Sequence, residues 1–198
     1  MKPSETRIYL IGGPSGTGKS SLSYPLAKHL QLSVFEVDDI QAVLEKMLTP
    51  EQAPLLHFWR THWEEFSQWP ESQRVEHFVR VAREYFSPAI EAVIAHHLEA
   101  GTSIVIEGDF LLPELAVKAE FDGVPALGRV RALFVTEEED QIRMNYQQRE
   151  GRDQHGRARA SWLFGEWLKT ECERLSLKTL PVRPWGSALE RASALFEL

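Results

Sequence analysis

A glycine-rich segment near the N-terminus has the residue types and spacing of a phosphate-binding loop. Residues 13–20 fit the pattern G-x-x-x-x-G-K-[ST] at every fixed position. Glycines allow the backbone to curl until successive N–H groups point at phosphate oxygens, and a following helix adds the positive end of its dipole. Lys19 would then contact the β- and γ-phosphates, and the Ser20 hydroxyl would bind Mg²⁺. The candidate nucleotide-binding residues are Gly13, Pro14, Ser15, Gly16, Thr17, Gly18, Lys19, Ser20, Ser21 and Arg157.

Acidic residues stand where two strands are expected to end. Asp38 and Asp39 follow one apolar run, and Glu107 and Asp109 follow another. Ligands of open α/β sheets bind beyond the carboxyl ends of the strands, so we expect these carboxylates to face the phosphate-binding loop. We predict that Glu107 helps to hold Mg²⁺ and that Asp38 accepts a proton from an attacking hydroxyl. Asp39 and Asp109 are equally well explained as helix caps, and the choice of base among Asp38, Asp39 and Asp109 stays open. The candidate metal ligands are Ser20 and Glu107, and the candidate substrate-binding residues are Asp38, Asp39, Gln41 and Asp109.

A cluster of arginines follows the fourth expected strand and its helix. Arg149, Arg152, Arg157 and Arg159 lie within residues 149–160, a local reversal of sign in an acidic chain. Guanidinium groups on a mobile loop can close over a triphosphate, neutralise charge on the transferring phosphoryl group and exclude water. We therefore predict an arginine-rich lid over about 149–160, with a solvated charged loop as the alternative. The candidate catalytic residues are Lys19, Asp38, Arg149 and Arg152.

Alternating strand and helix patterns predict an α/β domain built on a mainly parallel five-stranded sheet that is flanked by helices. The runs 102–106 and 130–135 are almost continuously apolar, as strands covered on both faces are, so they belong near the centre of the sheet. The other strands are expected at 7–11, 32–37 and 178–182, and helices at 19–30, 39–48 and from residue 187 onward. We predict one domain over residues 1–198.

More than fifty residues of helical periodicity separate the second and third expected strands, too many for a simple connection. We predict that this insertion, about residues 50–100, binds the substrate. A break or kink is expected at Ser87-Pro88, because serine suits a helix cap and proline the first helical turn. The start of segment 110–120 is expected to wall the same pocket. Four aromatic side chains either line that pocket or form an ordinary buried stripe: Trp59, Trp63, Phe66 and Trp69.

The composition of the chain limits the classes of protein to which it can belong. The chain has 198 residues, a net charge of -7 and 43% hydrophobic residues, which exclude disordered and collagen-like classes. The acidic balance argues against nucleic acid or an anionic membrane as a partner, and we expect neither. The apolar runs are too short for a membrane span, and we expect no secretory signal. Cys172 is the single cysteine and is expected to pack in the core, so the expected location is the cytoplasm.

A known family shares this order of motifs. The chain carries no N-K-x-D signature of guanine specificity, which argues against a GTPase. The phosphate-binding loop, Asp38, the Glu107-Gly108 pair and the arginine cluster resemble the P-loop small-molecule kinases over nearly the whole chain. Segments 12–20, 38–44 and 90–113 most resemble the 2-phosphoglycerate kinase-like branch. This resemblance implies the P-loop NTPase fold, ATP and Mg²⁺ as cofactors, and a small-molecule acceptor. Gln41 stands where that branch has an arginine, so a phosphorylated acceptor is less expected than the kinase class itself.

These observations favour an ATP-dependent phosphotransferase that moves the γ-phosphate to a hydroxyl of a small-molecule acceptor. Two alternatives share the same motifs. One is a nucleotide-binding regulator or adaptor without metabolite kinase activity, and the other is a toxin-like kinase that acts on a nucleotide sugar. The preference between ATP and GTP and the oligomeric state stay open.

Overall fold

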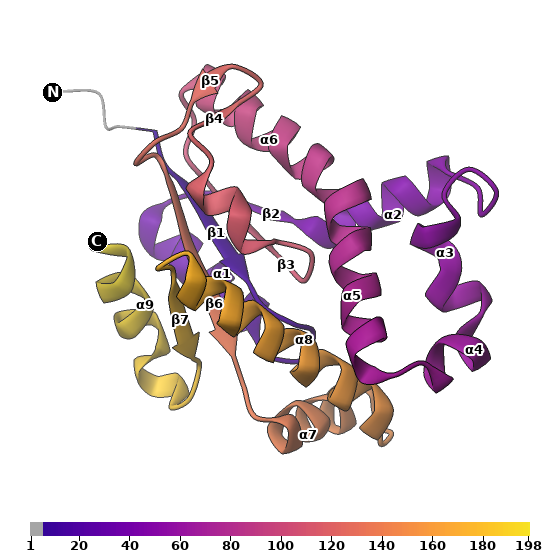
Figure 1. Cartoon of the computed structure of the whole chain (residues 1–198). Coiled ribbons are helices and arrows are strands. Elements are labelled where there is room, and N and C mark those ends of the chain that lie inside the picture. Colours follow the sequence, from indigo (N-terminus) through magenta and orange to yellow (C-terminus); the bar gives the residue numbers. More distant parts are fainter. Residues whose placement is uncertain (1–5) are drawn as a thin grey trace, which may run out of the picture.

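Five parallel strands form the central sheet of the protein. The computed structural model describes residues 6–198, and its strands are ordered β2-β3-β1-β6-β7 (Figure 1). Each neighbouring pair in this sheet is parallel. The strands are β1 (Ile8–Gly12), β2 (Val34–Glu36), β3 (Ile104–Gly108), β6 (Val130–Thr136) and β7 (Lys178–Pro181). The prediction of an α/β fold with a mainly parallel five-stranded sheet is therefore confirmed.

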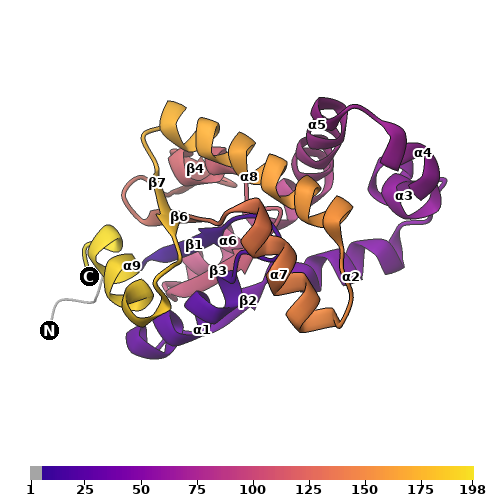
Figure 2. The ribbon, with the colours of Figure 1, turned by 90° about the horizontal axis from the view of Figure 1, so that it is seen from below.

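Helices cover both faces of this sheet, because successive buried side chains of a strand point to opposite faces. On β1, Ile8 and Leu10 belong to the core layer of α6 and α8, whereas Tyr9 and Ile11 belong to the layer of α1 and α9. Figure 2 shows α1 and α9 on one side of the sheet and α8 on the other. Cys172 of α8 is buried in the first layer, and burial raises the pKa of its thiol to about 12. The covering helices are α1 (Lys19–Leu30), α6 (Ser87–Ala100), α8 (His155–Arg174) and α9 (Ala188–Phe196).

A helical insertion separates β2 from β3, and its helices α3 and α4 stand away from the sheet (Figures 1 and 2). Its elements are α2 (Val37–Met47), α3 (Pro54–Thr61), α4 (Trp63–Gln68), α5 (Glu71–Val81) and a π-helical turn (Ala82–Phe86) that runs into α6. A break or kink was expected at Ser87-Pro88. The backbone is not broken there, but the π-helical turn ends at Phe86 and α6 begins at Ser87, with Pro88 in its first turn. The Ser87 N–H donates to the carbonyl of Ala82 in the π-helical pattern. The change from the π-helical to the α-helical pattern therefore lies directly before Pro88.

Helix α2 begins directly after β2, with no loop between them. β2 ends at Glu36 and α2 starts at Val37, so Asp38 and Asp39 lie in the first turn of a helix and not at a strand end as expected. Acidic residues suit this position because they face the positive end of the helix dipole. The Val37 side chain packs so tightly over Gly108 that a Cβ at Gly108 would collide with it. This contact brings the first turn of α2 to the end of β3.

The arginine cluster lies on a helical hairpin and not on the mobile loop that we expected. Helix α7 (Glu139–Glu150) ends at Gly151, whose φ of 72° suits glycine, and α8 begins at His155. Buried side chains of the two helices, among them Ile142, Tyr146 and Ala158, form a small core of their own. This packing makes the chain helical on both sides of a short turn.

Three short elements complete the fold. An antiparallel hairpin joins β4 (Glu120–Phe121) to β5 (Val124–Pro125), a 3-10 turn (Pro113–Val117) precedes it, and another 3-10 turn (Trp185–Ser187) leads into α9. The β4–β5 hairpin was not predicted from the sequence. No helix within residues 6–198 is long and apolar enough to cross a membrane.

Candidate active site

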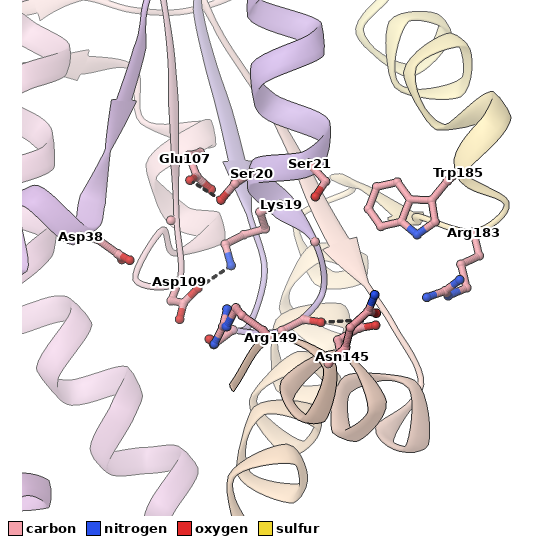
Figure 3. Close-up of a pocket in the computed structure, with 15 residues that line it drawn as sticks. Lys19, Ser20, Ser21, Asp38, Glu107, Asp109, Asn145, Arg149, Arg183 and Trp185 are labelled. Carbon is pink, nitrogen blue, oxygen red and sulfur yellow. Dashed lines mark hydrogen bonds and ion pairs between the residues drawn. The ribbon is translucent and has the colours of Figure 1, made fainter. Parts of the chain in front are cut away.

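The phosphate-binding loop lies at the carboxyl end of β1, where Gly12 pairs with Gly108 of β3 and with Phe134 of β6. A cavity of about 730 Å³ opens at this edge of the sheet (Figure 3). We call it the P-loop cavity. Ligands of parallel α/β sheets bind at such an edge. The predicted site residues that line it are Ser15, Gly16, Gly18, Lys19, Ser20, Ser21, Asp38, Glu107, Asp109 and Arg149. Gly13, Pro14 and Thr17 belong to the loop but not to the lining.

Hydrogen bonds within the loop fix its shape. The Thr17 hydroxyl donates to the carbonyl of Pro14 at 2.9 Å, and the Lys19 ammonium donates to the same oxygen at 3.1 Å. Gly18 precedes α1 with a φ of 87°, and no side chain of the described residues caps that helix. The N–H groups of the first turn of α1 are therefore available to an anion.

Lys19 is the charged group at the centre of the P-loop cavity. Its side chain is 8% exposed and forms an ion pair with Asp109 (Figure 3). Burial by itself lowers the pKa of Lys19, but the negative charges of Asp109, Glu107 and Asp38 reverse this effect and hold the pKa above its ordinary value. Lys19 is therefore protonated at neutral pH and can exchange Asp109 for phosphate oxygens.

Ser20 and Glu107 form an oxygen pair that fits Mg²⁺. The Ser20 hydroxyl donates to Oε1 of Glu107 at 2.8 Å, and Oε2 of Glu107 is buried without a hydrogen-bond partner among the described residues. Burial raises the pKa of Glu107 above its ordinary value, against the opposing effect of Lys19. A buried carboxylate oxygen without a partner is costly and calls for a ligand, and Mg²⁺ commonly takes one or two protein oxygens beside phosphate and water. Residues 6–198 contain no group of three or more His, Cys, Asp or Glu side chains placed to hold a metal.

Asp38 faces the same cavity from the first turn of α2 (Figure 3). Its side chain is exposed in the free protein. Desolvation by the neighbouring groups raises the pKa of its carboxyl above the ordinary value, and the negative charge of Asp109 adds to the rise while Lys19 opposes it. A carboxylate with a raised pKa is a stronger proton acceptor than a solvated one. The chemistry of Asp38 therefore suits a general base.

Helix α7 closes one side of the P-loop cavity. The side-chain amide of Asn145 donates to the carbonyl of Gly16 at 2.7 Å. A Cβ at Gly16 would lie 3.0 Å from Ile142 and 3.1 Å from Tyr146, so the loop and the helix are in close contact. Arg149, in the last turn of α7, lines the cavity. The helical hairpin thus places a guanidinium group over the phosphate-binding loop.

Residues after β7 also line the cavity, and they were not among the residues predicted from the sequence. The Trp185 indole lies against Gly18 so closely that a Cβ at Gly18 would collide with it. Arg183 lines the same end and donates to Glu137 Oε2 at 3.0 Å. One signal was present, because this segment follows the carboxyl end of a parallel strand, as the predicted carboxylates do. Two lining residues of α7 were missed as well: Asn145 and Gln148.

Curated proteins with similar sequences are 2-phosphoglycerate kinases. The chain is 33% identical over 115 residues to that of Methanococcus maripaludis (strain C5), a match that covers 54% of this chain and 37% of the relative. It is 32% identical over 113 residues to that of Pyrococcus furiosus, covering 54% and 36%. The match thus spans little more than a third of these relatives' own length. The expected resemblance to this branch is confirmed. No protein-family model matches the chain.

Solved structures with a similar fold cover nearly all of the chain. A sugar kinase from Janibacter sp. HTCC2649 aligns with a TM-score of 0.55 and 18% identity, covering 97% of this chain and 95% of that one. Shikimate kinase from Acinetobacter baumannii, in complex with shikimate, aligns with a TM-score of 0.52 and 13% identity, covering 98% and 93%. The chain shares the fold of these two proteins. At these identities the likeness concerns the fold alone.

Two predicted residues of α2 lie outside the lining of the P-loop cavity. Asp39 is exposed, as Asp38 is, but only Asp38 lines the cavity. Gln41 donates to Glu45 Oε1 at 2.7 Å, one helical turn further along α2. Their suggested roles in substrate binding stay predictions.

Two predicted arginines of the helical hairpin also lie outside that lining. Arg152 is exposed in the turn between α7 and α8. Arg157 is ion-paired with Glu150 at 2.9 Å, and its guanidinium lies 4.3 Å from the centre of the Tyr146 ring. Their roles at the nucleotide stay predictions too.

The four aromatic residues that were candidates for an acceptor pocket do not line the P-loop cavity: Trp59, Trp63, Phe66 and Trp69. Phe66 is 2% exposed and packs in the core of the insertion, whereas Trp63 is 54% exposed. Trp69 lines a second cavity of about 430 Å³, which shares no lining residue with the P-loop cavity. Phe110 is buried and stacked on Phe86, with 3.9 Å between ring centres, so the start of segment 110–120 is core.

Proposed function

We propose that this chain is an ATP-dependent phosphotransferase that moves the γ-phosphate of ATP to a hydroxyl of a small molecule. One observation carries the proposal: three sets of residues with different chemical roles lie together at the P-loop cavity. They are the uncapped amino end of α1 with Lys19, the Ser20–Glu107 pair, and the carboxylate of Asp38. A protein that only binds nucleotide has no need of a further carboxylate that lines the phosphate site and can accept a proton.

The triphosphate of ATP fits along the loop. Backbone N–H groups of the loop and of α1 donate to its oxygens, and Lys19 leaves Asp109 to contact the β- and γ-phosphates. Arg149 adds positive charge from the side of α7. The base then lies toward Trp185, whose indole offers a flat apolar face beside the loop.

Mg²⁺ neutralises charge on the β- and γ-phosphates when it is bound. Ser20 and Glu107 are the residues that would hold it, and the unpartnered Oε2 of Glu107 supports this role. Both are oxygen ligands, which Mg²⁺ prefers.

For phosphate transfer, the protein must position the two reactants and supply one proton acceptor. The acceptor hydroxyl oxygen bonds to the γ-phosphorus, the bond from that phosphorus to the β–γ bridging oxygen breaks, and ADP leaves. Asp38 takes the hydroxyl proton. Lys19 and Arg149 stabilise the negative charge spread over the transferring group.

The names of the similar proteins support this class of reaction. The curated relatives are 2-phosphoglycerate kinases, and the proteins of similar fold include a sugar kinase and a shikimate kinase. The matched segment covers little more than a third of the curated relatives, so their substrate does not carry over with the class.

A phosphate ester that forms only with an acceptor tests the proposal. The protein is incubated with ATP, Mg²⁺ and mixtures of hydroxyl metabolites, and new esters are detected by phosphorus NMR. We expect ester formation by the wild type, none by Lys19→Met and strongly reduced formation by Asp38→Asn. Glu91→Gln on α6, outside the P-loop cavity, should retain full activity. Tight ATP binding without an ester from any mixture would refute the proposal and favour a nucleotide-binding regulator.

A further inference from the structure

We propose that the acceptor of this site is an uncharged or cationic hydroxyl compound, and not a carboxylate or a phosphate ester. The inference rests on the proposed phosphotransferase function and concerns the charge that the acceptor side of the P-loop cavity tolerates. It comes from the carboxylates that gather at one end of that cavity, where the neighbouring cations are already engaged (Figure 3).

Carboxylates line the end of the cavity where phosphate transfer would occur. Asp38, Glu107 and Asp109 come from α2 and from the end of β3, whereas Arg183 and Trp185 line the opposite end (Figure 3). The aromatic end suits the nucleotide base, so the γ-phosphate points toward the carboxylates. An acceptor that approaches Asp38 therefore meets the acidic end.

The two cations beside these carboxylates are already engaged. Lys19 pairs with Asp109 in the free protein and faces the β- and γ-phosphates once ATP is bound. Arg149 comes from α7 and pairs with Glu150 at 2.7 Å. Neither is free to bind an anionic group of the acceptor while it serves the nucleotide.

None of the lysines and arginines of the insertion lines the P-loop cavity. Asp38, Gln41 and Glu45 follow one another at spacings of three and four residues, which places them along one face of α2. Glu45 accepts a hydrogen bond from Gln41 at 2.7 Å and pairs with Arg60 of α3 at 2.7 Å. Lys46 of α2 and Arg74 of α5 have no ion pair with the described residues, but neither lines the P-loop cavity or the second cavity. The face of α2 that continues from Asp38 is thus acidic or neutralised.

This arrangement selects the acceptor by charge. Bound ATP brings further negative charge, so an anionic acceptor would be repelled by the nucleotide as well as by Asp38 and Asp109. A neutral polyol can donate its hydroxyls to these carboxylates, and an amine adds attraction. Charges in a partly buried cavity are screened less than charges in solvent, so we expect a preference of about tenfold or more in kcat/KM over a matched anion.

Ion-exchange fractionation of metabolites tests the charge of the acceptor directly. A deproteinised cell extract is separated into anionic, neutral and cationic pools, and each pool is incubated with the protein, Mg²⁺ and γ-labelled ATP. We expect label to enter the neutral or the cationic pool. Transfer into the anionic pool at an equal or higher rate overturns the inference but leaves the proposed kinase function standing. Transfer into no pool overturns both.

A charge variant tests the cause, with 2-phosphoglycerate as the anionic probe and the protein loaded with Mg²⁺ and a nonhydrolysable ATP analogue. Asp109→Asn should strengthen 2-phosphoglycerate binding by about tenfold or more. Asp122→Asn makes the same charge change in the β4–β5 turn, outside the cavity lining, and should leave binding as in the wild type. A purely structural role of Asp109 would weaken the binding of nucleotide and probe alike. Binding of the probe by the wild type as tight as by Asp109→Asn overturns the inference.

Discussion

Removal of the Asp109 carboxylate is expected to weaken the nucleotide-free protein and to tighten nucleotide binding. In the free protein Asp109 is the ion-pair partner of Lys19. Asp109→Asn leaves the ammonium with the Pro14 carbonyl at 3.1 Å and with the charges of Glu107 and Asp38 nearby. Once ATP is bound, phosphate oxygens take the place of the carboxylate, and Asp109 becomes a like-charge neighbour of the phosphates. The same substitution therefore has opposite effects on the two states.

The size of the effect follows from the burial of the pair. Breaking a buried ion pair costs about 3–5 kcal/mol, whereas an exposed pair contributes about 0–1 kcal/mol. The Lys19 side chain is 8% exposed and that of Asp109 is 32% exposed, so this pair lies between the limits. We expect a loss of about 1–2 kcal/mol in the free energy of unfolding, intermediate between those values. That loss lowers the Tm of a chain of this size by about 2–8 °C, and it reappears as a decrease of about 5- to 30-fold in the Kd for nucleotide.

Thermal unfolding with and without a nonhydrolysable ATP analogue measures both effects, and calorimetric titration gives the Kd. Glu91→Gln is the matched control, because it removes one negative charge from an ion pair with Lys118 on the surface of α6. This control should change neither the Kd nor the gap between the two Tm values. An equal loss of Tm by Asp109→Asn in the free and the bound protein, with an unchanged Kd, would refute the reasoning.

Three further predictions address the base, the loop and the insertion. The Asp38 carboxyl must be ionised to accept a proton, so kcat/KM should fall as the pH falls through its pKa, which lies above the ordinary value of 3.8. A pH–rate profile measures this fall. The same fall of kcat/KM at low pH in Asp38→Asn would contradict the prediction. Gly18→Ala should weaken binding of the ATP analogue by about tenfold or more in a calorimetric titration, because a φ of 87° and the adjacent indole leave no place for a Cβ. Gly156→Ala in α8, where a Cβ meets nothing, should leave binding unchanged. Phe66→Ala should lower the free energy of unfolding by about 3–5 kcal/mol in a denaturant titration. Trp63→Ala should lower it by less than about 1 kcal/mol, because Trp63 is 54% exposed. Equal losses would contradict the core role of Phe66.

The features predicted best from the sequence are those that depend on residues close together in the chain. The loop of residues 13–20 has its glycines, Lys19 and Ser20 in one contiguous stretch, so its placement between a strand and a helix follows from local chemistry. The run 130–135 was recognised as a central strand because apolar, β-branched residues dominate it, and β6 covers it. The expected strand 102–106 is displaced by two residues, since Glu107 and Gly108 continue it into the site.

Contacts between distant residues could not be predicted in the same way. Ninety positions separate Lys19 from its ion-pair partner Asp109, and only the packing of β3 beside β1 brings them together. Trp185 is still further away in sequence, and its approach to Gly18 depends on the position of β7 at the sheet edge. Its place after a parallel strand was a usable signal, but the short strand before it has a weak apolar pattern.

Two local features were misjudged for different reasons. A helix was expected after the fourth strand, but α7 has few apolar side chains, so periodicity did not reveal its extent to Glu150 or its packing against α8. Contacts such as that of Tyr146 with the loop stabilise it from outside. The β4–β5 hairpin turns at Asp122 and Gly123, with φ values of 47° and 80°, as a type I′ turn requires. That Asp-Gly pair was a readable cue, but strands of two residues give no alternation to support it.

The central claim is that the P-loop cavity transfers phosphate and does more than bind nucleotide. The most direct measurement follows ADP and phosphate ester together in a single turnover, with γ-labelled ATP and an active metabolite pool. The account predicts one molecule of labelled ester for each ADP, and no ester when Lys19 is replaced by methionine. ADP formed with release of labelled inorganic phosphate alone, or bound ATP that never turns over in any pool, would contradict it.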